Sequence, residues 1–414
     1  MLSWYDYLTL TTSIISFFAF FTYLLFYMEN RNKAFKKPIL PKKLPKVSIL
    51  VPAYNEEKTI ASTLKSLLKL NYPKNKLEII AINDGSTDNT LKIMRRFRKY
   101  GVKVINKQNG GKASALNLGL KKAKGEIIVC MDADSIVCKN ALRYTIGYFD
   151  DPKVGAVASS LKVYKPKTFW QRMQFVEYIY NIFLRKVLAF MDSVFVVPGP
   201  FGLYRKKALK KVGGWDEKNI TEDMELTFKL QKAGYKIETS LASIVYTKTP
   251  ETLKRLIRQR VRWYRGFIIT SKKYKEMFFN LKFGNLGICT LPLYIVFVII
   301  LFVNIFSLIY SILSILRDLV LIYTKSGIDL PELDIMQINS PILYTSVSNI
   351  FWLANIVLYA YIFYISMMMA KEKKKVRNFL TYFVQIIFYP FILFYSWFLS
   401  IIKEITKAKA KWER

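Results

Sequence analysis

The chain has 414 residues, with 64 Lys and Arg against 29 Asp and Glu, a formal net charge of +35, and no histidine. The lack of histidine excludes histidine bases, histidine relays and histidine-ligated zinc, so acid–base chemistry near neutral pH falls mainly to Asp or Glu. The three cysteines, Cys130, Cys138 and Cys289, have the spacing of neither a metal knuckle nor a disulfide framework.

Such a basic chain suits an anionic membrane leaflet or an anionic substrate. Nucleic-acid binding is the competing explanation, but no zinc-finger, basic-zipper or RNP signature accompanies the charge. We therefore expect no nucleic-acid partner.

Four uncharged apolar runs are each long enough to cross a membrane, which takes roughly 20 apolar residues. They cover Leu8–Met28, Phe283–Leu316, Ile335–Ala370 and Asn378–Ile402. We expect Leu8–Met28 to be a retained anchor. The alternative, a cleaved signal peptide, would show a basic segment before the run and a small-residue cleavage site, and the sequence has neither.

These runs predict a multi-pass protein of the plasma membrane with one large water-soluble domain. The predicted parts are an N-terminal span (1–29), a basic linker (30–46), a catalytic domain (47–250), an interface helix (251–282), a C-terminal membrane region (283–402) of about three spans, and a basic tail (403–414).

Lys and Arg next to the spans predict the orientation. Basic residues follow the first span in 30–46 and recur in 371–377, whereas the 317–334 connection is acidic on balance. We therefore expect the N-terminus and 317–334 outside and the large domain in the cytoplasm. The basic tail does not fit, because a final span would place it outside. Since Pro390 lies within that run, a kinked or re-entrant 378–402 stays open.

Short apolar strands alternate with helical stretches in the large domain. Strands are predicted at 46–54, 77–86, 102–107, 126–134 and 154–160, and helices near 56–70, 89–99, 112–123 and 139–149. This alternation predicts a mostly parallel sheet with helices on both faces, and ligands bind beyond the carboxyl ends of such strands.

Polar, acid-bearing turns follow three of these strands, at 52–56, 83–86 and 132–134. Each could be an ordinary turn or helix cap. Asp132 and Asp134 are more informative, because alternation along an extended chain puts both carboxylates on one side. Adjacent carboxylates need a cation or a shared proton, and an oxygen-only pair suits Mg²⁺ or Mn²⁺ together with substrate phosphates.

Gly110, Gly111 and Lys112 open a predicted helix, where backbone N–H groups and a cation could hold a phosphate; a flexible turn before the helix is the alternative. The stretches 168–191 and 251–275 are amphipathic, and each could be a core helix or a helix in the membrane interface.

The segment "ITEDMEL" at 220–226 places three acids close together in a basic chain. It predicts a helix start with Thr221 as the N-cap. Glu222, Asp223 and Glu225 would then lie in the first turn, where negative charge suits the helix dipole.

Taken in order, these motifs resemble those of membrane-integrated family 2 glycosyltransferases, which include the synthases of hyaluronan, chitin, cellulose and poly-N-acetylglucosamine. The matching segments are "PAYNE" (52–56), "NDGSTDNT" (83–90), "NGGKASALN" (109–117), "DAD" (132–134), "GPFGLYR" (199–205), "TED" (221–223) and "QRVRW" (259–263), the last fitting Gln-x-x-Arg-Trp. "ITED" and the tail ending in "AKWER" are most like the poly-N-acetylglucosamine synthases.

The resemblance covers roughly 46–270 and implies an α/β GT-A domain, Rossmann-like with a mostly parallel sheet, joined to transmembrane helices and amphipathic interface helices. One departure is the first apolar region, which offers a single span where many polymerases have two or more.

The resemblance also implies roles for single residues. Nucleotide-sugar binding falls to Pro52, Tyr54, Glu56, Asp84, Lys112, Asp132, Gln259 and Arg262, and metal binding to Asp132 and Asp134. The acceptor would meet Gly199, Pro200, Phe201, Tyr204 and Trp263, although Trp263 could instead be an interfacial anchor. Asp223 would be the base that takes the acceptor proton, and Glu222 would help burial to raise the pKa of Asp223.

The leading interpretation is an inverting, metal-dependent, processive glycosyltransferase. It would move GlcNAc or Glc from a UDP-sugar to a growing β-linked polysaccharide and pass the product across the membrane, using Mg²⁺ or Mn²⁺. The alternative is single-step transfer to a lipid such as polyprenyl phosphate, diacylglycerol or a ceramide-like acceptor. A non-catalytic membrane or nucleic-acid-binding protein is a third hypothesis. Under the first two hypotheses we expect membrane lipids as partners, and an accessory membrane subunit is compatible with both.

Overall fold

The computed structural model describes residues 4–326, 347–372 and 376–408, which form two compact units. The larger unit comprises Phe26–Pro292 and Ile365–Arg414, and the smaller one comprises Met1–Leu25 and Leu293–Tyr364.

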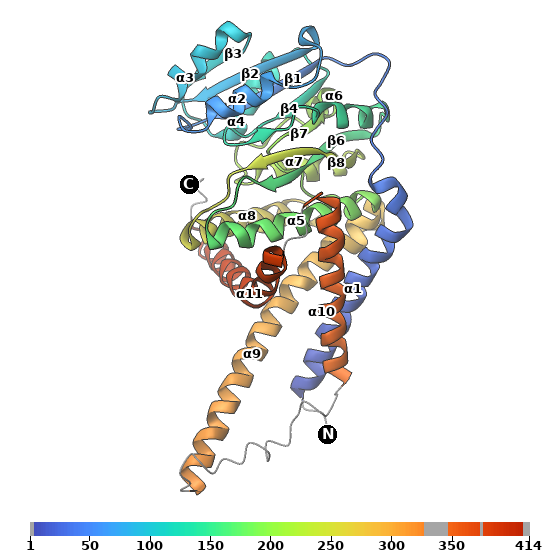
Figure 1. The fold of residues 1–414 in the computed structure, drawn as a ribbon, viewed down its shortest axis with the longest axis vertical. Coiled ribbons are helices and arrows are strands. Elements are labelled where there is room, and N and C mark those ends of the chain that lie inside the picture. Colours follow the sequence, from blue (N-terminus) through green and yellow to red (C-terminus); the bar gives the residue numbers. More distant parts are fainter. Residues whose placement is uncertain (1–3, 327–346, 373–375, 409–414) are drawn as a thin grey trace. The chain divides into compact units, whose positions relative to one another are not determined.

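An eight-stranded sheet forms the centre of the larger unit, in the order β3-β2-β1-β4-β7-β6-β8-β5 (Figure 1). Its strands are β1 (Val47–Ala53), β2 (Leu77–Asp84), β3 (Lys103–Lys107), β4 (Ile127–Cys130), β5 (Ile136–Val137), β6 (Val154–Val163), β7 (Gly202–Arg205) and β8 (Lys236–Thr247). β1 runs parallel to β2 and β4, β2 to β3, and β6 to β8, while β7 is antiparallel to β4 and β6, and β5 to β8. The predicted mostly parallel sheet is confirmed, with the antiparallel β7 near its middle.

The parallel half of the sheet matches the sequence prediction closely. Every residue of β1 is buried, as a continuous apolar run in a covered parallel sheet requires. The helices α2 (Ile60–Leu68), α3 (Thr90–Arg96) and α4 (Lys112–Lys122) lie within three of the predicted helical stretches. β1 and the inner face of α2 share one apolar core.

The predicted helix at 139–149 is wrong in kind, because the chain forms two 3-10 turns there, Leu142–Tyr144 and Ile146–Asp150. Thr145 Oγ1 donates to the carbonyls of Ala141 and Leu142, and such side-chain bonding competes with a regular helix.

Three longer helices pack together beside the sheet in the larger unit. α5 (Phe169–Phe190) begins with a capping box between Thr168 and Gln171. α8 (Leu253–Lys273) begins after Thr252, whose hydroxyl accepts a hydrogen bond from the backbone N–H of Arg255. Both amphipathic stretches are therefore helices, as predicted. α11 (Val376–Ile405) packs against both of them, and Figure 1 shows it next to α8. The short α6 (Lys206–Lys211) and α7 (Glu222–Lys232) complete the unit.

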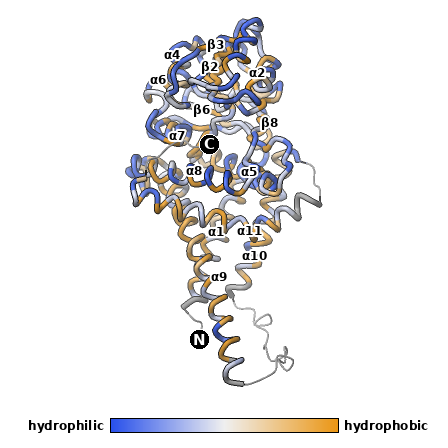
Figure 2. The backbone as a smooth tube through the Cα atoms, turned by 90° about the vertical axis from the view of Figure 1, so that its left-hand side faces the viewer, coloured by the Kyte–Doolittle hydropathy of each residue, from blue (hydrophilic) through white to orange (hydrophobic). Residues whose placement is uncertain are grey.

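The smaller unit contains most of α9 (Leu291–Ser326), most of α10 (Val347–Met369) and the first part of α1 (Trp4–Ala34). Asn355 Nδ2 donates to the Ser13 carbonyl at 2.9 Å, which joins α10 to α1. Four helices among the described residues, namely α1, α9, α10 and α11, are long and apolar enough to cross a membrane. Figure 2 shows apolar residues concentrated along α1, α9 and α10. The first part of the predicted apolar run 335–370, up to residue 346, lies outside the described residues.

Candidate active site

Lys112, Asp132 and Glu222 meet at one point. The Lys112 ammonium lies 2.7 Å from Asp132 Oδ1 and 2.9 Å from Glu222 Oε1. Lys112 is the first residue of α4, Asp132 follows β4, and Glu222 is the first residue of α7. Three motifs that are far apart in the sequence therefore converge at the carboxyl end of β4, where a parallel sheet binds its ligands.

The charges of this cluster support one another. Burial disfavours the ammonium of Lys112, but Asp132 and Glu222 outweigh burial and hold the pKa of Lys112 well above its usual value. Burial also disfavours the carboxylate of Glu222, and here Lys112 prevails and keeps the pKa of Glu222 below its usual value. At neutral pH, Glu222 is therefore an ionised carboxylate paired with a lysine.

Asp223 differs from its neighbour. Burial and the negative charge of Glu222 raise the pKa of Asp223 to about 6, against the opposing pull of Lys112 and Arg262. Its Oδ1 accepts from the backbone N–H of Met224 at 2.9 Å. A carboxyl group with a pKa near working pH is suited to accept a proton during a reaction.

Gly199 lies against the Lys112–Asp132 ion pair. A Cβ atom at this position would be 2.6 Å from Lys112 Nζ and 3.1 Å from Asp132 Oδ1. The backbone of the "GPFGLYR" segment thus reaches the ion pair because residue 199 has no side chain.

Asp84 holds the glycine loop in front of α4. It is buried, and its carboxylate accepts from Lys107 Nζ at 2.6 Å and from the backbone N–H groups of Gly110 and Gly111 at 3.0 and 2.8 Å. These bonds fix the loop so that Lys112 starts its helix beside Asp132. A uridine contact for Asp84 stays a prediction, and the contacts described here give it a structural role.

The end of β1 is bonded to the turn after β2. The Asn55 N–H donates to Ser86 Oγ at 3.0 Å, and the Glu56 N–H donates to Thr90 Oγ1 at 2.7 Å. Glu56 accepts from Thr59 Oγ1 at 2.6 Å, while Tyr54 is half-buried beside it. Pro52 is buried within β1. The two turns therefore form one edge, as the topology predicts.

Asp132 and Asp134 are both half-buried after β4. Ser135 Oγ donates to Asp134 Oδ1 at 3.0 Å. Among the described residues, no group of three or more His, Cys, Asp and Glu could hold a metal ion. Two partly accessible carboxylates fit Mg²⁺ or Mn²⁺ when a substrate phosphate supplies the other oxygens.

α8 contacts the segment before α7 directly. Arg262 Nη1 donates to the Ile220 carbonyl at 3.1 Å. A Cβ atom at Gly266 would lie 2.1 Å from Thr221 Oγ1, so the glycine permits this close approach. Thr221 stands at the N-cap position as predicted, but its hydroxyl makes no capping bond and instead donates to Asn219 Oδ1 at 3.2 Å.

A buried charge network next to Gln259 is absent from the sequence prediction. Arg260 is fully buried and forms an ion pair with Glu177 of α5. It also donates to Tyr389 Oη of α11 at 3.0 Å and to Gln259 Oε1 at 2.7 Å, and it lies 4.1 Å from the ring centre of Trp263. The sequence held one signal for this burial: Arg260 lies four residues after the apolar Leu256, so the two side chains share one face of the helix.

Two of the predicted acceptor residues lie in the core. Phe201 and Tyr204 are fully buried, and the ring of Tyr204 packs edge-on against Trp215 at 5.8 Å. Both side chains therefore pack in the protein interior beneath the site. Contact with an acceptor stays a prediction for these residues and for Pro200, which is also buried, whereas Trp263 is half-buried on α8.

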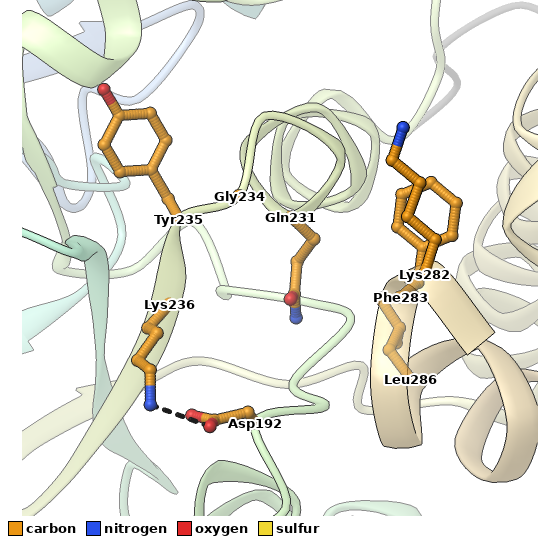
Figure 3. Close-up of a pocket in the computed structure, with 8 residues that line it drawn as sticks. All are labelled: Asp192, Gln231, Gly234, Tyr235, Lys236, Lys282, Phe283 and Leu286. Atoms are coloured by element: carbon orange, nitrogen blue, oxygen red, sulfur yellow. Dashed lines mark hydrogen bonds and ion pairs between the residues drawn. The ribbon is translucent and has the colours of Figure 1, made fainter. Parts of the chain in front are cut away.

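A separate surface pocket of about 160 Å³ contains none of the predicted site residues (Figure 3). It is lined by Asp192, Gln231, Gly234, Tyr235, Lys236, Lys282, Phe283 and Leu286. Lys236 and Asp192 form an ion pair of 2.8 Å across one of its walls.

Residues 45–266 match the family described as "Glycosyltransferase like family 2", and the chain belongs to this family. The matched region contains the Lys112 cluster and the Gln-x-x-Arg-Trp motif. The α/β domain that contains these residues has the GT-A fold.

Curated relatives point in the same direction. The chain is 36% identical to the poly-beta-1,6-N-acetyl-D-glucosamine synthase of Staphylococcus epidermidis over 250 residues. This match covers 58% of this chain and 60% of that protein. It is 39% identical over 250 residues to the probable glycosyltransferase YdaM of Bacillus subtilis, with the same coverage. The chain thus spans about 60% of the length of these relatives.

A solved structure shares the fold. The mannosyltransferase PcManGT from Pyrobaculum calidifontis, in complex with GDP-Man and Mn²⁺, aligns with a TM-score of 0.59 over 90% of this chain and 100% of its own, at 19% identity. Such low identity carries the fold alone.

Proposed function

We propose that this protein is an inverting, processive glycosyltransferase that builds a β-linked polysaccharide from a UDP-sugar. The support is the family, the similarity to poly-beta-1,6-N-acetyl-D-glucosamine synthases at 36% identity, and the helices that could cross a membrane. GlcNAc is the first donor to test. The catalytic domain would lie in the cytoplasm and the product would leave through the plasma membrane.

The observation that carries the proposal is the contact of Lys112 with both Asp132 and Glu222, next to an Asp223 whose pKa is raised. Inverting transfer needs one base. The base takes the proton of the acceptor hydroxyl group while the oxygen of that hydroxyl attacks C1 of the donor sugar. Asp223 is the proposed base. Glu222 helps to raise the pKa of Asp223, and Lys112 keeps Glu222 ionised.

The leaving nucleoside diphosphate needs positive charge. Lys112 lies beside Asp132, and Arg262 projects from α8 next to the Ile220 carbonyl, so both can approach the phosphates. Asp134 and Asp132 would hold Mg²⁺ or Mn²⁺, which would stabilise negative charge on the diphosphate. Gln259 and Trp263 would contact the diphosphate and the acceptor sugar from the same helix.

The test is a screen of radiolabelled UDP-sugars with the purified full chain in lipid, with and without Mn²⁺. Products would be sized and digested with glycosidases of known linkage specificity. The proposal predicts a long β-linked polymer from one UDP-sugar and no product without a divalent ion. A product with a single sugar on a lipid would contradict the polymerase and support the lipid glycosyltransferase. No sugar transfer from any donor would contradict both hypotheses.

A further inference from the structure

We propose that Arg260 sets the working orientation of two side chains beside it, Gln259 and Trp263. Arg260 touches no substrate in this role, so it is a positioning residue. The role depends on the proposed function, which places Gln259 at the diphosphate and Trp263 at the acceptor sugar. Four contacts of Arg260, and the atoms that these contacts leave free, indicate it.

One face of α8 is turned toward the segment before Asp223. Gln259, Trp263 and Gly266 recur on this face at intervals of four and three residues. A Cβ atom at Gly266 would collide with the side chain of Thr221, so this face lies against the residue two positions before Asp223. Gln259 and Trp263 are partly accessible and lie on the side of α8 from which a ligand beside Asp223 can be reached.

Two other helices hold Arg260 in place. Its side chain is fully buried and forms an ion pair with Glu177 of α5. Tyr389 Oη of α11 accepts from Arg260 Nη2 at 3.0 Å and donates to Glu177 at 2.5 Å. Arg260, Glu177 and Tyr389 therefore form a closed triangle of bonds. Because a guanidinium is planar and its donors have fixed directions, the triangle also fixes the direction of its remaining N–H groups.

An apolar cluster adjoins this triangle. Met173 of α5, Leu256 of α8 and Ile392 of α11 are buried in one cluster with Tyr389. Met173 and Leu256 lie four residues, about one helical turn, before Glu177 and Arg260. Hydrogen bonds are electrostatically stronger where water is excluded. The guanidinium is therefore a firmly held donor.

The contact with Gln259 determines which end of its amide faces outward. Arg260 Nη1 donates to Gln259 Oε1 at 2.7 Å. A guanidinium has donors and no acceptor, so the amide oxygen faces Arg260 and the NH₂ group faces away. In the part of the chain that the structure describes, no protein group accepts from Gln259 Nε2. Gln259 thus presents N–H donors, which suit the oxygens of a diphosphate.

Arg260 also covers one side of the Trp263 ring. The central guanidinium carbon lies over the ring, 4.1 Å from its centre. Guanidinium groups stack on aromatic faces, so this contact holds the ring and occupies one of its faces. Because Trp263 is only partly buried, its opposite face is the one available to an acceptor sugar.

A connection between helices alone would need only half of these contacts. The bonds of Arg260 to Glu177 and Tyr389 already join α8 to α5 and α11. The contacts with Gln259 and Trp263 lie within α8 itself, so they add nothing to that connection. What they do is orient two side chains of the Gln-x-x-Arg-Trp motif.

A double-mutant cycle on UDP affinity tests the action through Gln259. The purified full chain in lipid would be titrated with UDP at constant Mn²⁺, as wild type, Arg260→Lys, Gln259→Ala and the double variant. Lysine keeps a positive charge beside Glu177 but lacks the planar set of donors. We expect each single substitution to weaken UDP binding about 10-fold, and the double variant to bind no more than about two-fold more weakly than either.

Two results of this cycle would overturn the proposal. One is a pair of losses that multiply to about 100-fold in the double variant, because independent sites combine in that way. The other is wild-type UDP affinity in Arg260→Lys. UDP binding is measured without polymer formation. Coupled losses in a protein that makes no polymer would therefore contradict the proposed function alone, and multiplied losses in a protein that makes polymer would contradict the role of Arg260 alone.

Tyr389→Phe is the matched control for a structural effect. It removes the hydroxyl that Arg260 and Glu177 share but leaves the contacts of Arg260 with Gln259 and Trp263. We expect UDP affinity within about two-fold of wild type, whatever the change in melting temperature. A loss of about 10-fold would show that UDP binding follows the helix contacts in general, and would overturn the positioning role.

Initial rates with a β-linked GlcNAc oligosaccharide as acceptor test the action through Trp263. Arg260→Lys and Trp263→Ala should each raise the acceptor KM by a larger factor than they lower kcat, and their combination should raise KM little further. Tyr389→Phe should leave the acceptor KM unchanged. An unchanged acceptor KM in Arg260→Lys, or KM increases that multiply in the double variant, would contradict the proposed control of Trp263.

Discussion

Replacing Glu222 with Gln tests how the protein prepares Asp223 as a base. The negative charge of Glu222 is the second cause, after burial, that raises the pKa of Asp223 from an ordinary value of 3.8 to about 6. This difference corresponds to about 3 kcal/mol in favour of the protonated carboxyl group. The Glu222→Gln variant keeps the side chain's size but removes its charge.

The expected pH dependence follows from the sign of this effect. A base must be ionised, so wild-type kcat/KM should be about half its plateau at pH 6 and about one tenth of it at pH 5. Without the charge of Glu222 the pKa of Asp223 falls. The acid limb of Glu222→Gln should therefore move to lower pH, while Lys112→Gln should move it to higher pH, because Lys112 lowers the pKa of Asp223.

The assay is initial-rate sugar transfer by the purified protein across pH 4.5 to 8 at constant ionic strength, with folding checked at each pH. The two variants serve as controls for each other, since their acid limbs should move in opposite directions. An acid limb for Glu222→Gln that stays at the wild-type midpoint, or moves to higher pH, would refute the electrostatic role of Glu222.

Three further substitutions test the packing around the site. Gly199→Ala should displace the flexible lysine end that lies 2.6 Å from the new Cβ, and lower kcat by about 100-fold with little change in melting temperature; wild-type turnover would contradict this. Gly266→Val should push α8 away from Thr221 and reduce the free energy of unfolding by about 1–3 kcal/mol, measured as thermal stability in detergent, whereas an unchanged melting temperature would disprove the close contact. Glu177→Ala leaves Arg260 buried without its ion-pair partner and should cost about 3–5 kcal/mol of stability by the same assay; a loss below about 1 kcal/mol would contradict this account.

An exposed ion pair gives the matched control for the last substitution. Lys232 and Glu276 lie 2.7 Å apart, but both side chains are about half exposed. Glu276→Ala should therefore change stability by at most about 1 kcal/mol. A loss as large as that of Glu177→Ala would mean that burial is not what makes the Arg260 pair matter.

The sequence predicts the parallel half of the sheet because its strands are continuous apolar runs that end in polar turns. Asp132 and Lys112 were both expected near a ligand. Their contact with Glu222 could not be predicted, because it depends on how α4, β4 and α7 pack together. β7 was missed for a similar reason: "GLYR" is only four residues long and its pairing partners are distant in the sequence.

Helix faces were predictable, but their partners were not. The amphipathic pattern of 251–275 predicts α8 correctly, yet a buried Arg260 contradicts the rule that charges avoid the apolar face. Its partners, Glu177 and Tyr389, come from helices on either side of it in the sequence. The apolar run 378–402 likewise predicts a helix, but it does not predict that this helix packs against α5 and α8.

Single-turnover transfer by Asp223→Asn is the most direct test of the account. Asparagine keeps the shape of the side chain but cannot accept the acceptor proton, so UDP should bind within about two-fold of wild type while the transfer rate falls by about 10²–10⁴-fold. Transfer within a few-fold of wild type, with UDP binding intact, would show that Asp223 is not the base and would contradict the proposed mechanism.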